Sequence, residues 1–131
     1  MHFQKITIIG VGLLGGSLGL AIKQRGLASK VDGYVRRTAS IAESEKFGVV
    51  DHATRDLQHA VENADLVILC TPLSGMREIS GQMLPALKPG TIVTDVGSVK
   101  TASCRNSSRC LRREMFISSA AIRWRAVKKW G

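Results

Sequence analysis

The sequence predicts an α/β protein built on a doubly wound parallel sheet. Short apolar runs rich in β-branched residues alternate with stretches whose apolar residues recur at helical spacing. The first run leads directly into a glycine-rich loop, Gly10–Gly15, and this loop opens a helix. Alternating strands and helices imply parallel pairing through right-handed crossovers. The 131 residues leave room for one such domain.

The first three elements follow from local patterns. Residues 4–9 end in a β-branched apolar run, which predicts a buried strand. Residues 13–24 have apolar side chains at helical spacing, and Gly26 lies just beyond them, where it is suited to end a helix. Residues 31–35 predict a second short strand.

The later elements follow from caps, prolines and apolar runs. Thr38 or Ser40 is expected to cap the second helix, and Asp56 the third. Pro85 is expected to end the fourth helix. The expected elements are a helix from 38 to about 47, a short helix over 56–61, a strand over 66–70, a helix from about 75 to 84 and a strand over 91–95.

The charge of the chain is unevenly distributed. The formal net charge is +9, but residues 1–100 hold 11 Lys/Arg and 9 Asp/Glu, a balance of +2. Residues 101–131 hold 8 Lys/Arg and one Glu, a balance of +7. The first hundred residues therefore have the charge of an ordinary enzyme domain, and we expect no nucleic-acid partner.

Cysteine usage and hydropathy exclude other classes. The three cysteines form no C-x-x-C pair, which argues against a disulfide framework and against a metal site. Cys70 lies in an apolar run and is expected to be a small buried thiol. No apolar stretch is long enough to span a membrane and no secretory signal begins the chain, so we expect a cytoplasmic protein without a membrane partner.

The loop Gly10-Val11-Gly12-Leu13-Leu14-Gly15 matches the dinucleotide fingerprint G-x-G-x-x-G. It follows a predicted strand and opens a predicted helix, which is the context that a Rossmann unit requires. The first glycine permits a tight turn, the second leaves room for a pyrophosphate, and the third allows close packing of helix on strand. The helix amides then face the phosphates.

The end of the second strand bears on the choice between NAD and NADP. NAD sites usually place an acidic residue there for the ribose 2′-hydroxyl. This strand instead ends in Arg36-Arg37, whose charge and geometry suit a 2′-phosphate. The sequence therefore leans slightly toward NADP, with NAD left open.

Two further segments end predicted strands at the same edge of the sheet. Thr71-Pro72 follows one strand, and Gly97-Ser98 follows another. Ligands of open α/β sheets bind along that edge. Thr71, Pro72 and Gly97 are therefore expected to contact the cofactor, and Ser98 to donate a hydrogen bond to a small-molecule substrate beside the nicotinamide.

Three segments together resemble the prephenate/arogenate dehydrogenases. They are the glycine loop with the Gly-Ser-Leu that follows it, Leu66-Val-Ile-Leu-Cys-Thr-Pro-Leu, and Thr94-Asp-Val-Gly-Ser-Val-Lys. The resemblance covers about residues 3–103. It implies a parent enzyme of tyrosine biosynthesis that oxidises and decarboxylates prephenate or arogenate with hydride transfer to NAD or NADP. It further implies that Ser98 lies by the substrate and that the parent is a homodimer formed through a helical domain.

The family's catalytic histidine belongs to a Gly-Ser-His-Pro-Met-Ala-Gly-Ser-Glu-like motif, which the chain does not contain. Residues 104–131 are instead an irregular basic tail without helical or strand periodicity. When residues 115–131 are back-translated and read from the third base, they can give Val-His-Phe-Val-Gly-Ser-His-Pro-Met-Ala-Gly-Ser-Glu-Lys-Met-Gly. This recovery predicts that one base is lost near codon 103; a genuine divergent tail is the alternative.

The frameshift interpretation divides the chain into a dinucleotide-binding domain, 1–103, and a tail, 104–131, that forms no domain. We expect the sheet to be incomplete, because no strand of the tail would pair with the strand at 91–95. We expect the fragment to be inactive and prone to aggregation. Two other functions remain open, namely another NAD(P)-dependent hydroxyacid or imine dehydrogenase, and a non-catalytic nucleotide-binding module.

Overall fold

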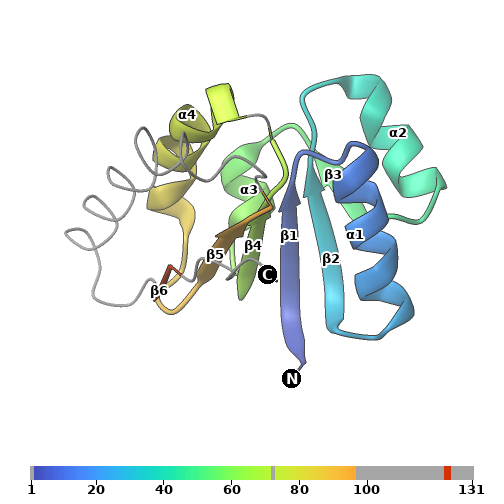
Figure 1. Ribbon diagram of the computed structural model, residues 1–131, viewed down its shortest axis with the longest axis horizontal. Helices are drawn as coiled ribbons and strands as arrows, with labels where there is room; N and C mark the ends of the chain where they lie inside the picture. Colours follow the sequence, from blue (N-terminus) through green and yellow to red (C-terminus); the bar gives the residue numbers. More distant parts are fainter. Residues whose placement is uncertain (1, 72, 97–122, 125–131) are drawn as a thin grey trace, which may run out of the picture.

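A computed structural model of the protein describes residues 2–71, 73–96 and 123–124. It confirms the predicted fold class: one parallel sheet with helices on both faces (Figure 1). The strands are β1 (Phe3–Ile9), β2 (Ala28–Tyr34), β3 (His52–Thr54), β4 (Leu66–Leu69), β5 (Ile92–Asp95) and β6 (Arg123–Trp124). The helices are α1 (Leu13–Gln24), α2 (Thr38–Lys46), α3 (Leu57–Val61) and α4 (Leu73–Met83), followed by a 3-10 turn at Leu84–Ala86.

The strand order is β3-β2-β1-β4-β5-β6, and every pair is parallel. The order runs outward in one direction from β1 to β3 and in the other from β4 to β6, so it reverses between β1 and β4. In Figure 1 the arrowheads of β1, β2 and β4 end at the same, upper edge of the sheet. Ligands of open α/β sheets bind at such a reversal, outside the carboxyl ends of the strands.

Alternation along the strands divides the core into two clusters. Ile6 and Ile8 face α1 and α2, and they pack with Ile22. Ile9 faces the other way, in a cluster that includes α3, Met76 and other residues of α4. Both faces of β1 are therefore buried, as expected for a parallel sheet covered on both sides.

Helix α1 lies close to the sheet because glycines form its buried face. A Cβ at Gly15 would lie 2.2 Å from the Gly10 carbonyl oxygen, and one at Gly19 would lie 2.1 Å from the Val49 carbonyl oxygen. Leu14, at a position of the apolar pattern that predicted the helix, is 57% exposed. The helix bounds were predicted correctly, but the contact with the sheet is made by backbone rather than by a leucine stripe.

Two expectations were wrong, and one strand was missed. Helix α2 is preceded by Arg37 in the N-cap position, and neither Thr38 nor Ser40 caps it, because the helix already begins at Thr38. The short strand β3 was not predicted. The expectation that no strand of the tail pairs with β5 fails at two residues, because Arg123 and Trp124 pair in parallel with Ile92 and Val93. The remaining residues of 104–131 lie outside the described part of the chain.

Candidate functional site

A cleft of about 460 Å³ opens at the carboxyl ends of β1, β2 and β4. Its volume lies within the range of small-molecule sites. It lies at the reversal of strand order, where a nucleotide is expected. The residues that line it are Gly10, Val11, Gly12, Tyr34, Val35, Arg36, Arg37, Ser40, Cys70 and Thr71.

The glycine loop forms one wall of the cleft. Gly10 has a φ of +92°, a value that side chains disfavour, and its amide donates to the Tyr34 carbonyl oxygen at 3.0 Å. A Cβ at Gly12 would meet no atom within 4 Å, whereas one at Gly15 would clash with the Gly10 carbonyl oxygen. Gly10 and Gly15 therefore fix the turn, and Gly12 leaves open space on the cleft side. This arrangement fits the pyrophosphate of a dinucleotide.

The amino end of α1 supplies hydrogen-bond donors without a competing side chain. Gly12 is the N-cap, no side chain caps the helix, and no acidic residue lies in its first turn. The first helical bond runs from the Gly16 amide to the Gly12 carbonyl oxygen, at 2.8 Å. The preceding amides have no partner within the helix, and such a terminus favours an anion.

Two arginines lie on the opposite wall. Arg36 and Arg37 follow β2 and line the cleft with Ser40 of α2. Neither guanidinium makes a hydrogen bond or ion pair with the described residues. Among the described residues, none of those that line this cleft is acidic. The described lining is therefore positively charged, which suits phosphate groups.

Two residues after β4 complete the cleft. The Thr71 hydroxyl oxygen is buried and has no hydrogen-bond partner among the described residues. The Cys70 thiol is partly buried, and this burial raises its pKa to about 11. Cys70 is therefore a neutral thiol at physiological pH. The sequence predicted a buried thiol, and the structure shows Cys70 only partly buried.

The structure brings together six of the residues that the sequence placed at the cofactor: Gly10, Val11, Gly12, Arg36, Arg37 and Thr71. Leu13 and Leu14 contribute backbone at the helix start, but their side chains are 92% and 57% exposed. Gly15 is buried beneath the loop. Pro72, Gly97 and Ser98 lie outside the described residues, so their expected contacts stay predictions.

Sequence reasoning missed Tyr34, Ser40 and Arg55. Tyr34 and Ser40 line the cleft, and Arg55 donates to the Thr38 hydroxyl at 3.3 Å beside the start of α2. Arg55 directly follows β3, so recognition of that strand would have placed it at the same edge of the sheet. The signal was weak, because β3 has three residues and only Ala53 is buried.

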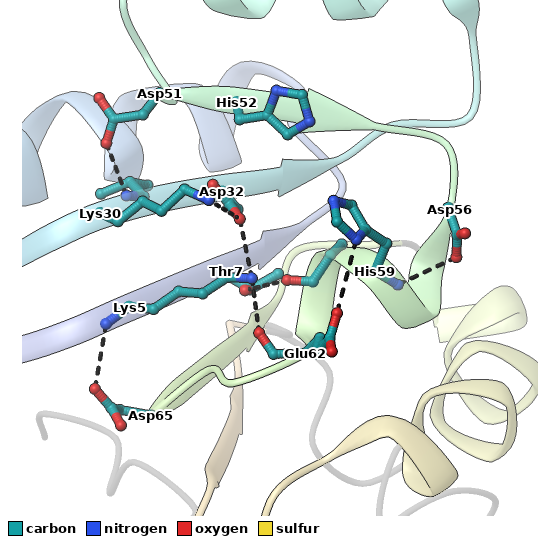
Figure 2. A network of polar contacts seen from close by, with 12 residues as sticks. Lys5, Thr7, Lys30, Asp32, Asp51, His52, Asp56, His59, Glu62 and Asp65 are labelled. Atoms are coloured by element: carbon teal, nitrogen blue, oxygen red, sulfur yellow. Dashed lines mark hydrogen bonds and ion pairs between the residues drawn. The ribbon is translucent and has the colours of Figure 1, made fainter.

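A polar cluster lies toward the amino ends of β1 and β4 (Figure 2). It differs from the cleft because its charged side chains are paired with one another. It comprises Lys5, Lys30, Asp32 and Asp65, which Figure 2 labels, together with Lys88, which bonds to Asp65. Asp32 is buried between the Lys5 ammonium at 2.9 Å and the Lys30 ammonium at 3.1 Å. Asp65 accepts from the Gln4 amide, the Lys5 amide and the Lys88 ammonium. The hydrogen bond from Lys88 holds the pKa of Asp65 below its ordinary value.

Within the described ranges, no group of three or more His, Cys, Asp or Glu is arranged to hold a metal ion. No helix in those ranges is long and apolar enough to cross a membrane.

The protein-family model of the prephenate dehydrogenase nucleotide-binding domain matches residues 18–123 of the sequence. The chain belongs to this family. The match begins after the glycine loop, whose assignment therefore depends on the geometry above, and it continues past residue 103 into the basic tail. The family identity confirms the resemblance that the sequence motifs indicated.

Named relatives agree with this family. A cyclohexadienyl dehydrogenase of Zymomonas mobilis is 34% identical over 117 residues, which are 89% of this chain and 40% of the relative. The crystal structure of Synechocystis arogenate dehydrogenase is 34% identical, with a TM-score of 0.73, over 80% of this chain and 37% of that one. Prephenate dehydrogenase from A. aeolicus, in complex with hydroxyphenyl propionate and NAD+, is 30% identical, with a TM-score of 0.69, over 76% of this chain and 35% of that one. The chain spans between 27 and 40% of the length of the curated relatives it matches.

Proposed function

We propose that this chain is the cofactor-binding part of a dehydrogenase that oxidises and decarboxylates prephenate or arogenate. The observation that carries the proposal is the glycine loop at the strand reversal, with an open Gly12 on one wall. On the other wall lie two arginines that bond to none of the described residues. Family membership supplies the substrate class. When bound, a nicotinamide cofactor supplies the acceptor for a hydride from the substrate.

The chain's own residues bind and orient the cofactor in this proposal. The start of α1 and Gly12 hold the pyrophosphate, and Thr71, which lines the same cleft, contacts the cofactor beside them. The arginines after β2 favour NADP over NAD, because a guanidinium binds a 2′-phosphate through charge and paired hydrogen bonds. Ser98 is proposed to hydrogen-bond the substrate beside the nicotinamide.

The parent enzyme is proposed to act in the cytoplasm as a homodimer joined through a helical domain. We further propose that residues 104–131 are encoded out of frame. The support is that the Gly-Ser-His-Pro-Met-Ala-Gly-Ser-Glu motif can be recovered from residues 115–131 in the alternative frame. A histidine in that motif would orient or deprotonate the substrate hydroxyl, as a general base does.

The experiment has two arms. The gene is sequenced across codons 98–135, and the frame is then restored by one inserted base near codon 103 together with the downstream sequence. The restored protein should reduce NADP or NAD when given prephenate or arogenate, and the 131-residue chain should not. A gene without the shifted motif would contradict the frameshift. A restored protein that oxidises neither substrate would contradict the function.

A further inference from the structure

Arg36 lies at the junction of two cavities. The dinucleotide cleft and a second cavity of about 360 Å³ share Tyr34 and Arg36. The second cavity continues from the tips of β2 and β3 onto α4, where Arg55, Glu78, Ile79 and Gln82 complete its lining. A ligand that begins at the glycine loop can therefore extend past Arg36 into this second space.

The position of Arg36 depends on a glycine in α4. A Cβ built on Gly75 would lie 2.6 Å from the Arg36 Nη2 atom, which is closer than real Cβ contacts. The guanidinium therefore lies against the backbone of α4 in the space that a side chain at residue 75 would fill. Because the clashing atom is the end of a flexible side chain, an alanine at this position would displace Arg36 without disrupting the helix.

The two cavities differ in charge. Within the described part of the chain, the cleft is lined by Arg36 and Arg37 and by no acidic residue. The second cavity contains Glu78 beside Arg36 and Arg55, and Glu78 accepts a hydrogen bond from the Gln82 side-chain amide at 3.2 Å. The Glu78 carboxylate can accept from an exocyclic amino group, and Tyr34 offers an aromatic ring to a flat base.

We propose that Arg36 and Arg37 have different roles, and that Gly75 is the positioning residue that separates them. The second cavity is the adenine pocket. Arg36, whose guanidinium lies against the Gly75 backbone, forms one wall of this pocket and stacks on the base. Arg37, on the cleft side, contacts the 2′-phosphate and selects NADP. This inference rests on the proposed function and deepens it, since the sequence alone assigned both arginines to the phosphate.

The roles predict different selectivities. Arg36→Ala should weaken NAD and NADP equally, by about tenfold, because both cofactors carry adenine. Arg37→Ala should weaken NADP by about tenfold or more and change NAD by less than about twofold. Affinities are measured calorimetrically with the 131-residue chain, NAD and NADP.

Gly75→Ala supplies the direct test, with Gly81→Ala as its matched control. Gly81 lies in the same helix, and a Cβ there would meet no atom within 4 Å. Gly75→Ala should weaken both cofactors like Arg36→Ala without lowering the melting temperature, whereas Gly81→Ala should keep the wild-type affinities. In the Arg36→Ala background, Gly75→Ala should have no further effect, because it acts through Arg36.

Equal affinities for Gly75→Ala and Gly81→Ala would overturn the proposal, as would a selective loss of NADP in Arg36→Ala. If Gly75→Ala fails to fold, the comparison of Arg36→Ala with Arg37→Ala still decides between separate and shared roles. A wild-type chain that binds neither NAD nor NADP would instead contradict the proposed function.

Discussion

Charged side chains are arranged differently at the dinucleotide cleft and in the polar cluster. At the cleft, Arg36 and Arg37 have no partner among the described residues. In the polar cluster, Asp32 and Asp65 are each bonded to lysines. Buried carboxylates require such partners, because an unpaired buried charge is costly. The comparison indicates that the cluster stabilises the fold, whereas the arginines of the cleft, which bond to none of the described residues, are available to an anionic ligand.

The largest expected effect comes from filling the cleft without touching the cluster. Gly12→Val places a side chain where the structure shows no atom within 4 Å, so the fold should be retained. The same side chain would occupy the proposed path of the pyrophosphate. We expect dinucleotide affinity to fall by about 100-fold or more, with only a small decrease in melting temperature because valine is a poorer N-cap than glycine.

Gly16→Ala is the control for this substitution, since a Cβ there would make only an ordinary 3.7 Å contact with Val49. Calorimetric titration and thermal unfolding of both variants give the comparison. Wild-type affinity in Gly12→Val would contradict the placement of the pyrophosphate.

The reverse experiment disrupts the cluster and spares the cleft. Asp32→Asn removes the charge that pairs with Lys5 and Lys30. The free energy of unfolding should fall by about 2–3 kcal/mol, because a mostly buried Lys5 ammonium loses its anionic partner. Urea unfolding measures the loss, and the cofactor affinity of the folded fraction should be unchanged. A stability equal to that of the wild type would show that the ion pairs contribute nothing net.

A smaller effect should depend on pH. The Lys88 hydrogen bond lowers the pKa of Asp65, so Asp65 stabilises the fold above the ordinary value of 3.8 and loses this effect as pH falls through its folded pKa. Asp65→Asn should be less stable than the wild type by about 1 kcal/mol near neutral pH. The difference should shrink below about pH 4. A constant difference down to pH 2 would argue against ionisation as its cause.

Much of the fold was predictable because local signals agreed with the tertiary structure. The bounds of α1 were predicted at Leu13 and Gln24, since the glycine loop and Gly26 mark its two ends. Asp56 caps α3 as expected, through a hydrogen bond from the His59 amide. The nature of the α1 contact was not predictable from apolar spacing, because glycines make it and Leu14 faces solvent.

The candidate site was predicted where it depends on a motif and missed where it depends on tertiary proximity. The glycine loop, Arg36 and Arg37 could be identified from their position after predicted strands. Arg55 and Gly75 could not, because Arg55 follows a strand of three residues and Gly75 matters only through the Arg36 side chain that lies against it. The two paired residues of β6 were likewise hidden, because a tail without periodicity gives no strand signal.

Hydrogen–deuterium exchange of the 131-residue chain, with and without saturating NADP, tests the central comparison most directly. The account predicts slower exchange in peptides that cover residues 10–16 and 35–41, where the loop and the arginines would contact the cofactor. Peptides that cover residues 61–66, in the polar cluster, should exchange at the same rate in both states. Unchanged exchange at 10–16 and 35–41, or protection confined to 61–66, would contradict it.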